Sequence, residues 1–271
     1  IYLSQFIYLI LQSYEYNNLS YDGRIYIPPD TQIIPKFIND TSFNLLNKLK
    51  NDKNSFRLHV NRDGPGNDIV NDKLRFKIDD NGNKKYINEP NEEYPYQILG
   101  QYSVHGPSYN YTSKDWDSRT KSKIIFGCKI NISDIEKTIV IDEKGEIIPS
   151  FNTHYILKED IDIDNLSYIK KLMISNIFKF ILRMSCFSRT QDHKDQIEYN
   201  YLNTIYFPKE EFIDINNINQ SLYEFYGFNQ NEILLINNVL NDKNENLSSF
   251  SHIELQSKFN KSGKRDMITK E

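Results

Sequence analysis

Apolar residues recur every three or four positions in several stretches of the chain, which is the spacing that one face of an α-helix produces. This spacing predicts an amphipathic helix at residues 1–16 and a second helix at residues 39–49. A long helix is predicted at residues 165–184, where one apolar stripe continues for about five turns. Two shorter helices are expected at residues 220–226 and 229–240.

Residues that favour helix ends stand at the limits of these stretches. Asp164 or Asn165 is suited to cap the long helix, because its side-chain oxygen can accept a hydrogen bond from an unpaired backbone N–H. Gly227 is suited to end the first short helix, since glycine readily adopts the left-handed conformation found there. Asn229 and Glu232 have the spacing of a capping box before the last helix.

Short β-prone runs fill residues 56–157, and turn-forming residues separate them. Asn81-Gly82 suits the positive φ of a tight turn and predicts a hairpin over residues 74–87. A second hairpin is predicted over residues 138–148, with its turn at Asp142–Gly145. Further extended segments are expected at 123–130, 153–157 and, stopping at Pro208, 201–207. The whole pattern predicts an α+β fold with a β-rich module, a long packed helix and a C-terminal pair of short helices.

The composition fits a folded protein without bulk positive charge. Hydrophobic residues make up 38% of the 271 residues, which is enough for a sizeable core. There are 33 basic and 37 acidic residues, so binding to nucleic acid would require a local basic patch. Cys128 and Cys186 lie far apart, which excludes a disulfide scaffold or a cysteine-built zinc site and favours a reducing, cytoplasmic location. No apolar run reaches the roughly 18 to 20 residues that a membrane helix needs.

The densest polar constellation follows the long helix. It combines Arg and Gln, which pair bidentately with guanine and adenine edges, with Ser, Thr, His and Lys, which suit phosphates. Its members are Arg183, Ser185, Ser188, Arg189, Thr190, Gln191, His193 and Lys194, with Lys170, Lys171 and Lys179 on the helix itself. The alternative interpretation is a solvated loop beside an ordinary amphipathic helix.

A second basic cluster surrounds the single tryptophan. It consists of Lys114, Trp116, Arg119, Lys121 and Lys123. Such a cluster would suit DNA phosphates, although two aspartates within it dilute the charge. The alternative is an ordinary loop that its aromatic residue anchors.

Six motifs follow one another from Lys121 to Ile236. They are Lys121-Ser-Lys-Ile-Ile125, Thr153-His-Tyr155, an Asn-led helix with the pieces Asn165–Ile169 and Ile174–Leu182, Arg189-Thr-Gln191, Ile205-Tyr-Phe-Pro208, and the closing run Leu222–Ile236. In this order they resemble the carboxy-terminal target-recognition segment of adenine-specific DNA methyltransferases of type II restriction-modification systems, including fused enzymes that both cut and methylate. Asn176 departs from the family pattern, which usually has Lys there.

The resemblance implies a DNA sequence-recognition role for this segment. The catalytic domain, with its S-adenosyl-L-methionine, would precede a chain that opens with Ile rather than Met. The implied partners are double-stranded DNA and that catalytic domain of the same polypeptide, and no catalytic residue or metal ligand is expected here. Residues 1–55 would form a helical connector, 56–240 the target-recognition domain and 241–271 a polar tail. The residues expected at the DNA are Lys121, Lys123, Arg183, Ser188, Arg189, Thr190, Gln191, His193 and Lys194.

Two other functions stay open at the level of sequence. Asp142, Lys144 and Glu146 have the residue types of a Mg²⁺-dependent endonuclease site. They coincide with a predicted hairpin turn, however, which favours turn chemistry at those positions. The second alternative is a non-enzymatic interaction domain whose helices match the family through compositional chance.

Overall fold

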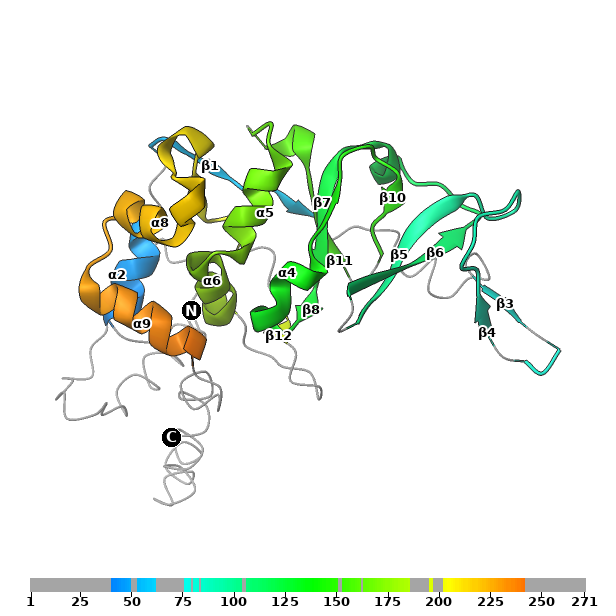
Figure 1. Cartoon of the computed structure of the whole chain (residues 1–271), viewed down its shortest axis with the longest axis horizontal. Helices are drawn as coiled ribbons and strands as arrows, with labels where there is room; N and C mark the ends of the chain where they lie inside the picture. Colours follow the sequence, from blue (N-terminus) through cyan, green and yellow to red (C-terminus); the bar gives the residue numbers. More distant parts are fainter. Residues whose placement is uncertain are drawn as a thin grey trace, which may run out of the picture.

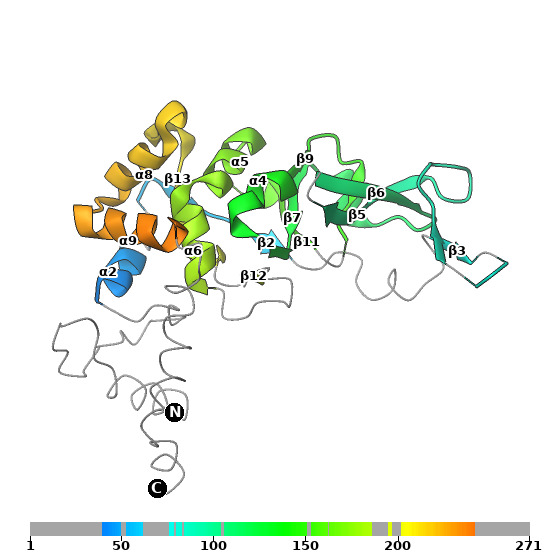
Figure 2. The same cartoon turned by 60° about the horizontal axis from the view of Figure 1, so that its bottom comes forward.

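The molecule is built in three layers: a group of helices, a four-stranded sheet and a three-stranded sheet (Figure 1). In this computed structural model the described residues are 40–49, 53–61, 76–78, 80–82, 84–103, 106–150, 153–161, 163–185, 195–196 and 202–241. Figure 2 shows the helices at one end of the molecule and the ribbons of the outer sheet extending from the other end. The fold is therefore α+β, as the sequence predicts.

The four-stranded sheet forms the middle layer, with the strand order β2-β11-β7-β9. Its strands are β2 (Val60–Asn61), β11 (Thr153–Leu157), β7 (Lys123–Gly127) and β9 (Val140–Asp142). All of its pairings are antiparallel, and Tyr155 lies opposite Ile125. Every residue of β7 and β11 is buried, because helices cover one face of the sheet and a second sheet covers the other.

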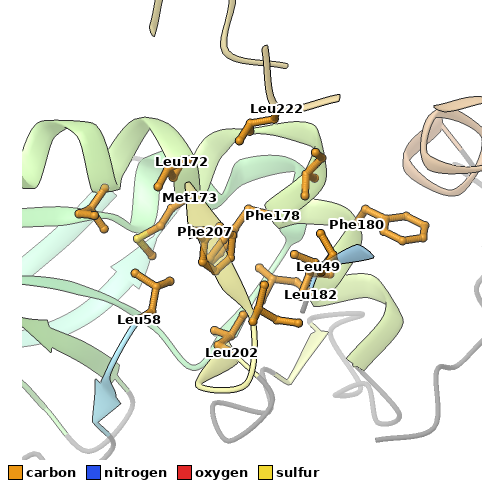
Figure 3. Close-up of a cluster of buried hydrophobic side chains, with 14 of the residues drawn as sticks. Leu49, Leu58, Leu172, Met173, Phe178, Phe180, Leu182, Leu202, Phe207 and Leu222 are labelled. Carbon is orange, nitrogen blue, oxygen red and sulfur yellow. The ribbon is translucent and has the colours of Figure 1, made fainter. Parts of the chain in front are cut away.

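Helices cover the first face of this sheet and share one hydrophobic core with it. They are α2 (Asp40–Lys48), α4 (Ile135–Thr138), α5 (Leu166–Ile174), α6 (Asn176–Ser185), α8 (Ile218–Tyr226) and α9 (Gln230–Asn241). In Figure 3, Phe178 of α6 lies beside Phe207, and their ring centroids are 5.8 Å apart. Burial of each such side chain contributes about 1.5–3 kcal/mol.

The three-stranded sheet, with the order β10-β5-β6, covers the second face. Its strands are β5 (Tyr96–Ser103), β6 (Gly106–Thr112) and β10 (Ile147–Ile148), and β10 runs parallel to β5. Leu99 packs against Ile125 of the middle sheet. Ile98, the next residue before Leu99, belongs to a separate cluster on the outer face, as the alternation of side chains along a strand requires.

Short elements complete the described fold. β1 (Ser55–Arg57) pairs with β13 (Tyr206–Pro208), β8 (Lys129–Ile130) with β12 (Asp195–Gln196), and β3 (Phe76–Ile78) with β4 (Lys84–Tyr86), all antiparallel. The 3₁₀ turns are η1 (Asp117–Thr120), η2 (Ile132–Asp134), η3 (Lys158–Asp160), η4 (Glu210–Phe212) and η5 (Ile215–Asn217). No helix of the described residues is both long and apolar enough to cross a membrane.

The predicted long helix is wrong in one respect, because it is two helices that meet at Ser175. The backbone of Ser175 is extended, with φ −65° and ψ 157°. Its hydroxyl accepts a hydrogen bond from the Phe178 N–H at 3.2 Å and thereby caps α6. The Asn176 N–H, freed by the break, donates to Asn219 Oδ1 of α8 at 2.7 Å. The apolar stripe continues across the break because both helices face the same core.

The predicted hairpin over residues 138–148 is also wrong. The turn lies at Asp142–Gly145, but β9 before it pairs with β7 and β10 after it pairs with β5. The segment therefore links the two sheets. The N–H groups of Glu146 and Ile147 donate to the Asp142 carboxylate, which directs the chain away from β9.

Several local predictions are confirmed. The hairpin over residues 74–87 is β3–β4, with Gly82 at φ 82°. Asn165 caps α5, and Gly227 ends α8 in the left-handed conformation. The capping box of α9 is formed in both directions, since the Asn229 N–H donates to Glu232 Oε2 and the Glu232 N–H donates to Asn229 Oδ1.

Other predictions differ in extent or lie outside the described residues. The predicted strand at 123–130 is interrupted at Cys128, and only Tyr206–Pro208 is extended in the segment predicted at 201–207. The helix predicted at 1–16 and nearly all of the 241–271 tail lie outside the described residues. Within the predicted connector, Leu45 and Leu49 of the α2 region belong to the main core. The predicted boundary at residue 55 falls within β1.

Candidate nucleic-acid interface

The constellation after the long helix is only partly within the described residues. Ser188, Arg189, Thr190, Gln191, His193 and Lys194 lie outside them. The described chain on either side is anchored: α6 ends at Ser185 within the helical layer, and the chain returns at β12, which pairs with β8. This segment therefore leaves from the main core and returns next to the strand that follows β7.

Arg183 lies in the last turn of α6 and is half-buried. The neighbouring Leu182 and Met184 are fully buried, so packing of α6 against the core fixes the position of Arg183. On the same pair of helices, Lys171 is exposed, while Lys170 and Lys179 are half-buried. The described helices thus carry basic residues toward the start of the predicted loop.

The prediction that Lys123 contacts DNA is wrong in this structure, because the side chain of Lys123 is completely buried. Its ammonium donates to Asp142 Oδ2 at 2.6 Å, to the Lys121 carbonyl at 2.9 Å and to the Arg119 carbonyl at 3.0 Å. These three acceptors satisfy all three donors of a lysine. Burial lowers the pKa of Lys123, and the hydrogen bond from Asp142 opposes that shift.

Asp142 serves the turn between the two sheets. Besides Lys123, it accepts hydrogen bonds from the N–H groups of Glu146 and Ile147, both at 2.9 Å at their shortest. It is buried, whereas Lys144 and Glu146 are exposed. The Asp142 carboxylate is thus used for structure, and the described residues hold no group of three His, Cys, Asp or Glu arranged to bind a metal ion.

The remaining cations of the second cluster are paired with carboxylates or aromatic rings. Arg119 binds Asp115 through Nε at 2.5 Å and Nη2 at 2.7 Å. This hydrogen bond lowers the pKa of Asp115 and raises that of Arg119. Lys121 is exposed and binds Glu159, a hydrogen bond that raises the pKa of Lys121. Lys114 lies 5.0 Å from the centre of the Trp116 ring.

The tryptophan itself anchors this segment. Trp116 packs with Tyr96 against the outer-face cluster of Ile98 and Ile148. The guanidinium of Arg119 lies 5.0 Å from the Tyr96 ring centre. The arrangement favours the alternative interpretation of the second cluster, an anchored loop, and most of its positive charge is compensated locally. Contact between Lys121 and DNA stays a prediction.

The sequence interpretation missed a different basic surface, on residues 53–61. Buried Phe56, Leu58 and Val60 alternate there with exposed Arg57 and His59. The guanidinium of Arg57 lies 5.3 Å from the centre of the Tyr206 ring on the neighbouring strand β13. The alternation of apolar and polar residues was the available signal for this strand, but its pairing with β13 could not be read from it.

Comparison with known proteins adds no assignment. No family model matches the chain, and no curated protein matches its sequence.

Proposed function

We propose that this chain is the DNA sequence-recognition part of a site-specific adenine-N6 DNA methyltransferase of a restriction-modification system. The main support is that the described segments that carry the resemblance, although far apart in sequence, contribute to one hydrophobic core. They are β7, β11, α5, α6, β13, α8 and α9. Matches that arose from composition alone would have no reason to pack together. Their common core therefore favours the proposal over a chance resemblance.

The middle sheet and its helices provide the rigid platform that sequence reading needs. A side chain that discriminates between bases must be held closely in position, and elements buried on both sides provide such support. β7 and β11 are entirely buried, and α5 lies against β7 and β9. The ends of the Thr-Gln segment are attached to this platform through α6 and through the β12–β8 pair.

The proposed division of labour follows from the chemistry of adenine methylation. An enzyme that modifies a base takes it out of the stack, and a separate set of groove contacts selects the site. In this proposal S-adenosyl-L-methionine and the flipped adenine bind the catalytic domain of the same polypeptide. The present chain contributes contacts to double-stranded DNA, with Arg189 and Gln191 as base readers and the neighbouring Ser188, Thr190, His193 and Lys194 near phosphates.

The proposal is tested by selecting duplexes from a random pool with the full 271-residue chain. We expect enrichment of one defined site that contains an adenine, with an affinity that falls steeply as salt rises. Arg189→Ala should weaken binding to that site by about 1–3 kcal/mol if Arg189 reads a base. Arg189→Lys keeps the charge but loses the bidentate geometry, so it should also relax sequence preference.

The matched control is Lys144→Ala, which removes one exposed cation from the turn between the sheets. It should leave both affinity and site preference unchanged. Absence of duplex binding, or binding that enriches no sequence, would reject the proposal. Mg²⁺-dependent cleavage that is lost in Asp142→Ala but retained in a variant of equal stability would instead support a nuclease.

A further inference from the structure

Residues 53–61 and the strand beside them form a locally basic surface. Lys53, Arg57 and His59 are all exposed, and every second residue of an extended segment lies on the same side. On β13, the backbone N–H of Lys209 donates to the Asn54 carbonyl at 3.0 Å, which places Lys209 directly after the last paired residue of the ribbon. We call Lys53, Arg57 and Lys209 the basic ribbon.

The basic ribbon contains no compensating acid of its own. Residues 53–61 and 202–209 include Lys53, Arg57 and Lys209 but no Asp or Glu, in a chain whose net charge is −4. Two acids border it, and both are bonded to asparagines. Asp160 accepts from the Asn61 amide at 3.2 Å, and Glu210 accepts from the Asn165 amide at 2.8 Å. The sign of the local charge is therefore opposite to that of the whole chain.

Arg57 is the best-positioned member of this surface. Its guanidinium is stacked over Tyr206, which restricts the side chain while its planar edge with five N–H donors can still face a ligand. Other cations in the described residues are bound to carboxylates, including Lys48, Arg119, Lys121, Lys123 and Lys137. Within the same described residues, no hydrogen bond or ion pair of Arg57 competes with an incoming anion.

Packing on the opposite side keeps the ribbon in place. Phe56 and Leu58 are buried in the main core, and Phe207 lies beside Phe178. The Tyr226 hydroxyl donates to the Tyr206 carbonyl at 2.6 Å, which ties the strand under Arg57 to helix α8. Arg57 is thus presented by a fixed backbone, which lowers the entropy lost when it binds a partner.

We propose that the basic ribbon binds backbone phosphates of duplex DNA through Arg57, with Lys53 and Lys209 adding to the local potential. This inference rests on the proposed function and adds a contact surface outside the predicted loop. Phosphate is the expected ligand, because the surface combines a guanidinium with lysines and lacks the amide side chains that read adenine edges beside them. Such contacts would orient the duplex and would not select its sequence.

The experiment measures how the affinity of the full chain for several unrelated duplexes depends on salt. Loss of one phosphate contact reduces the slope of log K against log salt by about 0.9. Arg57→Ala should show this reduction and should weaken binding by a similar factor on every duplex. Arg57→Lys retains the cation and should restore most of the slope. Since Arg57 is exposed, its replacement is not expected to unfold the protein.

Lys121→Ala is the matched control, because it also removes one exposed cation, but one already bound to Glu159. Its slope should equal that of the unchanged chain. If the unchanged chain binds DNA and Arg57→Ala leaves the slope intact, the inference fails while the proposed function stands. If Arg57→Ala alters sequence preference and not the slope, Arg57 reads bases and the phosphate assignment fails. If the unchanged chain binds no duplex, the proposed function fails first.

Discussion

Lys121 and Lys123 show how differently two lysines of one motif are used. Both belong to Lys121-Ser-Lys-Ile-Ile125, and the sequence interpretation assigned both to DNA. Lys121 is exposed and bound to Glu159, whereas Lys123 is enclosed by β9 and the η1 segment and bound to Asp142. The sequence cannot distinguish them, because the burial of Lys123 is created by Asp142, which lies on another strand of the sheet.

The first prediction compares these two lysines. Lys123→Met removes the ammonium and leaves the buried Asp142 carboxylate without its cation, which should lower the free energy of unfolding by about 3–5 kcal/mol. Lys121→Met breaks an exposed ion pair and should change stability little. Urea denaturation of both variants measures the difference. Equal stabilities would mean that Lys123 is not enclosed as described.

At the scale of elements, local signals were predictable where the residues that decide a structure are close in sequence. Asn81-Gly82, Gly227 and the Asn229–Glu232 capping box all act within a few residues, and each forms as predicted. The break at Ser175 was not predictable from the apolar stripe, since Asn219 of another helix receives the freed Asn176 N–H. Long-range partners decide such features.

Strand pairing was the least predictable property of the elements. The β5–β6 ribbon was missed as a unit, and the two strands on either side of Asp142–Gly145 were wrongly paired with each other. Each run is β-prone, but the sequence does not specify its neighbour in the sheet. The same limit applies to the site, where the Arg57–Tyr206 stack depends on the pairing of β1 with β13.

The second prediction concerns the turn that links the two sheets. Gly145 has φ 69°, and a Cβ added there would lie 2.5 Å from the Thr120 carbonyl carbon. Gly82 has a similar φ of 82°, but nothing lies within 4 Å of an added Cβ. Gly82→Ala should therefore cost about 1–2 kcal/mol for its left-handed backbone alone. Gly145→Ala should cost about 1–3 kcal/mol more because of the added steric conflict.

Thermal or urea unfolding of the two glycine variants provides the measurement. The comparison isolates the close contact with Thr120, because both positions share the unfavourable φ. A loss at Gly145 no greater than at Gly82 would show that η1 moves away freely. In that case the turn would not hold the two sheets together.

At the scale of the whole molecule, β7 and β11 contribute to two hydrophobic clusters at once. Ile124 and Ile156 face the helical layer, while Ile125 and Leu157 face the three-stranded sheet. Loss of either layer would expose one side of strands that are otherwise fully buried. The layers should therefore depend on each other, although the outer sheet and the helices lie at opposite ends of the molecule (Figure 2).

The third prediction is that both layers unfold in one transition. Trp116 is the only tryptophan and packs on the outer sheet, so its fluorescence reports that layer, while far-ultraviolet circular dichroism reports mainly the helices. The two urea transitions should coincide, as two-state unfolding requires. Leu99→Ala, at the contact between the sheets, should shift both midpoints together through a loss of about 2–5 kcal/mol. A tryptophan transition at lower urea would instead show that the ribbons form an independently unfolding unit, and the platform would then consist of the helices and the middle sheet alone.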